Sequence, residues 1–128
     1  MKKFVKASKF KNVNSIEFVS KLVSCIKEEG YHAIDSSNSL GYEIQVEDVD
    51  SLPVLMDVVS YALSDMMGYD VYDITNVDDE GYNYAAVKGE AFVKLIVDIG
   101  DYFNNGVQGY IDMKFDNGNV LFQDWYED

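Results

Sequence analysis

Amphipathic helix patterns alternate along this sequence with short runs of strand-forming residues, and this alternation limits the folds available to the chain. Residues 15–29, SIEFVSKLVSCIKEE, place apolar side chains on one face at helical spacing. Asn14 stands at the position of an N-cap, with Glu17 as its capping-box partner, and Gly30 follows the last turn. The pattern predicts a helix over 15–29.

The two segments that follow this helix have the pattern of a β-hairpin. Residues 31–35 and 42–47 flank the turn-forming sequence SSNSLG, and in the second segment apolar positions 42, 44 and 46 alternate with polar neighbours. A second helix pattern covers residues 50–66 and ends before Gly68. We expect strands around 69–75 and 82–87 after it, joined by the acidic turn NVDDEG.

A third round of the same pattern completes the chain. Phe92, Leu95, Ile99 and Phe103 are spaced as on one face of a helix over 90–103. Strands over 110–115 and 119–125 then form a hairpin across the turn sequence Asp-Asn-Gly.

The sequence therefore predicts an α+β fold in a single domain, 1–128, built from three helix-strand-strand units. The units cover residues 14–47, 50–87 and 89–125, and the glycines that end their helices, Gly30, Gly68 and Gly106, are equally spaced. Repeats of this length usually share one core. An α+β domain in which the glycine spacing is a coincidence stays open, and residues 1–13 form a basic arm or an edge strand.

Charge restricts the partners of this protein. The chain has 23 acidic and 10 basic side chains, a net charge of −13, and every basic residue is lysine. Seven of the lysines lie in residues 1–27, together with a single acid, Glu17. The acidic body repels nucleic acid and anionic membranes and favours a basic protein partner, so we expect neither direct nucleic-acid binding nor membrane binding.

The residues that usually carry catalysis or bind metals are scarce. Cys25 and His32 are the only cysteine and histidine, and no phosphate-binding loop or nucleophile elbow is present. The segment 76–87 resembles a calcium loop, but its twelfth position is Val87, where a bidentate carboxylate is needed. We expect no cofactor and no catalytic residues, and a weak cation site over 78–80 stays open.

Tyrosines and carboxylates interleave on the second hairpin, and further acids lie in two other clusters. Tyrosine is favoured both on half-buried strands and in interface cores, so ordinary sheet packing and partner binding are both open. The candidate partner-binding residues are Asp70, Tyr72, Asp73, Asp78, Asp79, Glu80, Tyr82 and Tyr84 on the hairpin, Glu47, Asp48 and Asp50 after the first hairpin, and Asp124 and Trp125 near the C-terminus.

The chain resembles small acidic inhibitors from phages and mobile elements. The resemblance lies in the short length, in the acidic segments EDVD, DDEG and DWYED, and in basic residues that are all lysine. These inhibitors are the anti-CRISPR and anti-restriction proteins. The resemblance implies a DNA mimic that binds a basic CRISPR effector, nuclease or restriction enzyme and blocks its nucleic-acid cleft.

The sequence leaves a second function open. A toxin-immunity or other protein-protein interaction module would bind through the tyrosine-rich sheet face, and an enzyme ranks last. The N-terminus lacks the apolar run of a signal peptide, so we expect a location in the cytoplasm of a bacterial host. The oligomeric state is open.

Overall fold

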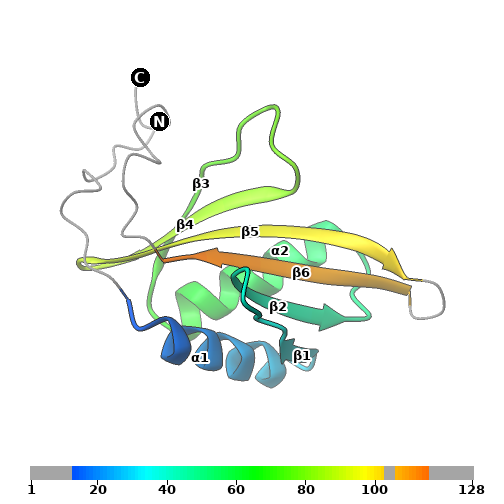
Figure 1. The fold of residues 1–128 in the computed structure, drawn as a ribbon, viewed down its shortest axis with the longest axis horizontal. Helices are drawn as coiled ribbons and strands as arrows, with labels where there is room; N and C mark the ends of the chain where they lie inside the picture. Colours follow the sequence, from blue (N-terminus) through cyan, green and yellow to red (C-terminus); the bar gives the residue numbers. More distant parts are fainter. Residues whose placement is uncertain (1–12, 103–105, 116–128) are drawn as a thin grey trace.

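The structure, a computed structural model, describes residues 13–102 and 106–115. Within them the chain forms two α-helices, one π-helical turn and a six-stranded sheet (Figure 1). The elements in chain order are α1 (Ser15–Glu28), β1 (His32–Asp35), β2 (Tyr42–Glu47), α2 (Leu52–Tyr61), η2 (Ala62–Met66), β3 (Asp70–Asp73), β4 (Tyr82–Lys88), β5 (Ala91–Tyr102) and β6 (Gly106–Lys114). None of the helices described is long and apolar enough to cross a membrane.

All six strands belong to one antiparallel sheet in the order β1-β2-β6-β5-β4-β3. Strands β3 to β6 follow one another as a meander, and the β1–β2 hairpin joins the sheet through the pairing of β2 with β6. The longest strands, β5 and β6, therefore lie in the middle of the sheet and connect its two halves.

Helix α1 begins and ends where the sequence predicts. The side chain of Asn14 accepts a hydrogen bond of 3.1 Å from the backbone N–H of Glu17, which satisfies one of the free donors of the first turn. Gly30 follows the helix with a φ of 100°, a conformation that favours glycine. The apolar face of α1, including Leu22 and Ile26, is buried.

Helix α2 also follows its predicted apolar stripe, but its C-terminal end widens into the π-helical turn η2. The backbone N–H of Met67 donates to the carbonyl of Ala62, five residues earlier, at 3.0 Å. The wider turn brings Met67 into the core, whereas Met66, which the regular helical pattern selects, is only half-buried.

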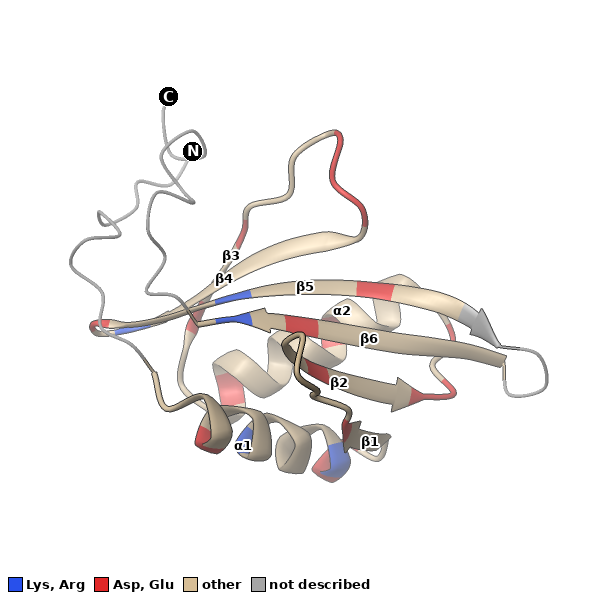
Figure 2. Cartoon of the chain, in the orientation of Figure 1, with Lys and Arg blue, Asp and Glu red and all other residues tan. Residues whose placement is uncertain are grey.

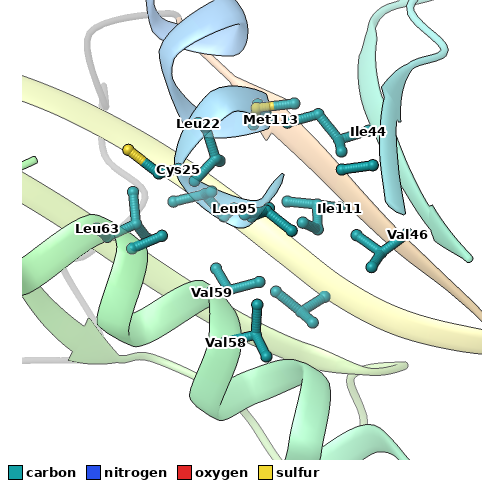
Figure 3. Close-up of a cluster of buried hydrophobic side chains, with 14 of the residues drawn as sticks. Leu22, Cys25, Ile44, Val46, Val58, Val59, Leu63, Leu95, Ile111 and Met113 are labelled. Atoms are coloured by element: carbon teal, nitrogen blue, oxygen red, sulfur yellow. The ribbon is translucent and has the colours of Figure 1, made fainter. Parts of the chain in front are cut away.

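Both helices pack on the same face of the sheet. Figure 3 shows Leu22 and Cys25 of α1, Val59 of α2 and Leu63 of η2 around strand residues such as Leu95. Leu55 of α2 approaches Gly109 of β6 closely: an added Cβ atom there would lie 2.6 Å from Cδ2 of Leu55. Glycine at this position lets α2 lie directly on the sheet.

The prediction of three helix-strand-strand units is wrong, although the fold is α+β. The segment predicted as a third helix is β5, in which Val93, Leu95 and Val97 alternate toward the helices and are buried. Phe92 and Ile96 on the other face of β5 are apolar too, so the segment also matches helical spacing. Gly106 begins β6 and ends no helix.

Two other predicted strands cannot be compared with the structure. The predicted strand over 119–125, and residues 1–12 of the predicted arm or edge strand over 1–13, lie outside the described residues.

Candidate functional site

Acidic residues are spread over most of the described elements (Figure 2), and three groups of them lie on loops or on the sheet. The first is the loop between β3 and β4, residues 74–81, which we call the acidic loop. The second is the junction between β2 and α2. The third is the sheet face turned away from both helices, which we call the open face.

The acidic loop is held at its base by Asp73. The Oδ1 atom of Asp73 accepts hydrogen bonds from the backbone N–H of Thr75 at 3.0 Å and from its hydroxyl at 2.6 Å. The same hydroxyl oxygen accepts a bond of 2.9 Å from the backbone N–H of Asn83. These contacts tie the end of β3 to the start of β4 and give Asp73 a structural role.

Asp79 fixes the middle of the acidic loop. Its Oδ2 atom accepts a hydrogen bond from the backbone N–H of Asn76 at 2.8 Å and another from the side-chain amide of the buried Asn83 at 3.1 Å. Two donors therefore stabilise the central one of the three successive carboxylates.

The tip of the acidic loop points into solvent. Val77 is 100% exposed, and Asp78 and Glu80 are exposed on either side of the anchored Asp79. Gly81 closes the loop with a φ of 70°, and a Cβ atom there would lie 2.5 Å from the carbonyl oxygen of Val97. The result is a fixed loop in which the exposed Val77 is followed by the exposed carboxylates of Asp78 and Glu80.

The tyrosines of the second hairpin do not form one surface. Tyr84 is 6% exposed in the core beneath the helices, and burial, followed by the charge of Asp73, raises the pKa of its hydroxyl to about 12. Tyr82 packs against the same core. Tyr72 pairs with Ala85 and lies on the open face, as does the exposed Asp70.

The junction between β2 and α2 combines exposed acids with backbone contacts. Asp48 adopts a φ of 59°, and Asp48 and Asp50 are exposed. The Oε1 atom of Glu47 lies 2.6 Å from Nδ1 of His32, within hydrogen-bond distance. Of this cluster, Glu47 is engaged with a neighbouring side chain, whereas the other two carboxylates face solvent.

The open face carries a group of acids that the sequence did not single out: Glu43 of β2, Asp98 of β5 and Asp112 of β6. Glu43 pairs directly with Asp112 across the strands. Burial raises the pKa of the Asp112 carboxyl above its ordinary value, and the charge of Glu43 and a hydrogen bond to it raise this pKa further. Lys114 opposes the rise, and Asp98 adds to it.

A hollow of about 260 Å³ lies beside this carboxyl pair. The turn of the β1–β2 hairpin forms one wall, where Leu40 is 93% exposed. A smaller hollow of about 160 Å³ lies at the start of α1, where the ammonium of Lys88 donates to the carbonyl of Met67 at 3.0 Å and lies 5.7 Å from the ring centre of Tyr69. Both hollows combine apolar and charged walls.

Cys25 and His32 stand apart from each other. Cys25 is buried between α1 and the sheet, and burial, followed by the charges of Glu28 and Glu29, raises the pKa of its thiol. His32 is exposed on the edge strand β1. In the residues that the structure describes, no group of three His, Cys, Asp or Glu side chains is arranged to hold a metal ion.

The structure thus separates the candidate residues by role. The residues that reach the surface are Asp70, Tyr72, Asp78, Glu80, Asp48 and Asp50. Those that form hydrogen bonds with neighbouring groups are Asp73, Asp79 and Glu47. Those that pack with the core are Tyr82 and Tyr84. Asp124 and Trp125 lie outside the described residues. Comparisons with protein-family models, curated proteins and solved structures find no match to this chain.

Proposed function

We propose that this protein is an acidic inhibitor that binds a basic nucleic-acid-binding enzyme, such as a CRISPR effector, a nuclease or a restriction enzyme. A cleft that holds DNA or RNA is lined with lysine and arginine to neutralise phosphates. Carboxylates whose separations are similar to those of the phosphates compete for the same lysine and arginine side chains. The net charge of −13 supports this proposal, in which a phage or mobile element encodes the protein and the bacterial cytoplasm is its place of action.

The acidic loop is the observation that carries the proposal. It projects from the body between β3 and β4 (Figure 1) and exposes Val77 next to the carboxylates of Asp78 and Glu80. Because hydrogen bonds within the loop already fix its shape, binding costs little additional conformational entropy. A fixed loop that exposes one apolar side chain followed by carboxylates fits a basic cleft that has an apolar floor.

The internal bonds of the loop also decide how the proposal is tested. Reversing the charge of Asp79 would break the loop, so Asp78→Lys with Glu80→Lys is the informative pair. Asp57→Lys with Asp65→Lys is the matched control, because both residues are exposed in the α2–η2 segment and the change in net charge is equal. Circular dichroism verifies that both variants are folded.

The experiment begins with the immobilised protein, a bacterial lysate, and elution either by a salt gradient or by duplex DNA or RNA. We expect both elutions to release a nucleic-acid enzyme, because the contact is ionic and the binding sites overlap. In an activity assay of the released enzyme, the loop variant should lose inhibition and the control should keep it. Equal inhibition by the loop variant and the unmodified protein would contradict the role of the loop.

A second candidate, a toxin-immunity or other interaction module, is supported by a different surface. Leu40 is almost fully exposed at the turn of the β1–β2 hairpin, and Tyr42 follows it at the start of β2. Exposed apolar and aromatic side chains of this kind anchor protein interfaces. A partner bound there would resist salt and ignore nucleic acid, and Leu40→Ser would weaken its binding.

A further inference from the structure

Three carboxylates of the open face lie on neighbouring strands. Asp98 of β5 and Asp112 of β6 alternate with buried core residues, so their side chains point away from the helices. Asp98 pairs with Tyr110 and therefore lies diagonally across from Asp112, with about 7–8 Å between Cα atoms for neighbours of this kind. Glu43 of β2 lies directly opposite Asp112. Figure 2 shows these acidic segments of β5, β6 and β2 next to one another, and we call the three residues the acidic patch.

The lysines of the open face lie to one side of the acidic patch. Lys94 and Lys114 pair with each other across β5 and β6, two residues beyond Asp112. On the described strands, the sheet on the other side of Asp112 carries no lysine. Among residues 13–102 and 106–115, none of the three carboxylates of the patch forms an ion pair. A basic occupant is therefore attracted to the patch and repelled only at its border.

A buried acceptor lies beside the acidic patch on the same face. Gln108 of β6 is 8% exposed, and its Oε1 atom has no hydrogen-bond partner among the described residues. Gln108 pairs with Gly100, two residues from Asp98, so the position opposite its side chain is empty of one. A buried acceptor without a donor costs free energy, which an incoming N–H donor recovers. Carboxylates and an amide oxygen all accept hydrogen bonds, and lysine and arginine side chains only donate them.

The acidic patch is continuous with the acidic loop. Gly81, the last residue of the loop, approaches β5 so closely that an added Cβ atom would lie 3.0 Å from Cβ of Asp98. The exposed carboxylate of Glu80 immediately precedes Gly81. One partner surface can therefore contact the loop and the patch together.

We propose that the acidic patch binds a segment of a protein partner that carries lysine or arginine side chains, and that this contact extends the contact made by the acidic loop. The inference rests on the proposed function, because both surfaces select the same basic partner. Alternate side chains of an extended segment are about 7 Å apart, close to the separation of Asp98 and Asp112. The same carboxylates repel nucleic acid and anionic membranes.

The probe is a short peptide of alternating arginine and alanine, titrated into the isotope-labelled full-length protein and followed by NMR. We expect the amide resonances around Asp98 and Asp112 to shift most. Asp98→Asn with Asp112→Asn should raise the Kd of the peptide about tenfold, because two ionic contacts are lost. Asparagine keeps the Oδ1 acceptor at position 98, which receives the backbone N–H of Ile99 at 2.8 Å, so the strand is preserved.

The matched control is Asp57→Asn with Asp65→Asn, which makes the same change in net charge at exposed positions of the α2–η2 segment. Its Kd should change by less than about twofold.

A second pair of variants tests the opposite sign. Lys94→Gln with Lys114→Gln should lower the Kd about threefold, because it removes the repulsion at the border of the patch. Lys21→Gln with Lys27→Gln, on the exposed side of α1, makes the same change in net charge and should leave the Kd nearly unchanged.

Equal Kd values for the Asp98 and Asp112 variant and for its control would overturn the proposal. The same shifts on titration with magnesium chloride at equal ionic strength would also overturn it, because they would identify a simple cation as the occupant. This experiment needs no enzyme, so its failure is distinct from a failure of the proposed function. Peptide binding at the patch, with no nucleic-acid enzyme retained from the lysate, would contradict the proposed function alone.

Discussion

The two faces of the sheet are built from the same strands but by different chemistry. On the face beneath the helices, neighbouring strands place apolar side chains against α1 and α2, and Gly109 makes room for Leu55 of α2. On the open face, Glu43, Asp98 and Asp112 lie near Lys94, Lys114 and the buried Phe92. The first face stabilises the fold, and the second is available for charge-dependent contacts.

Adjacent residues on β5 offer the sharpest test of this difference. Leu95 is buried beneath the helices, whereas Ile96 is half-buried on the open face. We expect Leu95→Ala to lower the free energy of unfolding by about 3 kcal/mol, because it removes core contacts and leaves a cavity. Ile96→Ala should cost roughly 1 kcal/mol, since less apolar surface is lost. Urea denaturation of both variants measures the difference, and equal losses would contradict it.

Asp78 and Asp79 provide the next comparison, within the acidic loop. Asp79→Ala removes the acceptor of two hydrogen bonds, one from the buried Asn83, and should lower the free energy of unfolding by about 1–2 kcal/mol. Asp78→Ala at the exposed tip should change it by less than about 0.5 kcal/mol. Hydrogen exchange at Asn76 should increase only in the first variant. A loop equally protected in both would show that Asp79 does not fix its shape.

The smallest effect concerns Asp112 on the open face. Its raised pKa means that the folded protein holds the proton to a higher pH than the unfolded chain, so stability falls as pH rises from the ordinary carboxyl range through the raised pKa. Asp112→Asn should therefore be more stable than the unmodified protein at pH 7, by less than about 1 kcal/mol because water screens this group.

The two proteins should become equally stable below the ordinary aspartate range. Thermal melts from pH 3 to pH 8 test this convergence, with Asp78→Asn as the control for net charge. A difference that stays constant over this pH range would contradict it.

Local signals explain which elements the sequence predicts. The Asn14 cap and the Gly30 stop depend only on neighbouring residues, and both helices are found close to their predicted limits. The sequence does not predict the π-helical turn η2. A π-helical turn has one residue more than an α-helical turn, and this extra residue leaves the apolar stripe nearly unchanged. Strand β5 is mistaken for a helix because both of its faces are apolar at several positions.

The candidate site shows a similar division. Exposure of Asp78 follows from its place in a polar turn, but the bonds of Asp79 to Asn83 require the β3–β4 pairing to be known. Glu43 and Asp112 are far apart in the chain and meet only because β2 pairs with β6. Alternation in β2 indicated that Glu43 is polar and exposed, but no local pattern in the sequence gives its partner.

The two strands at the borders of the sheet, β1 and β3, have four residues each. Their exposed carboxylates, Asp35 on one border and Asp70 and Asp73 on the other, lie at or next to the strand ends. An incoming strand would gain few backbone hydrogen bonds there and would approach negative charge. The long apolar strands β5 and β6 have no free border, so this chain, 48% hydrophobic, is protected against sheet-to-sheet polymerisation at both sides.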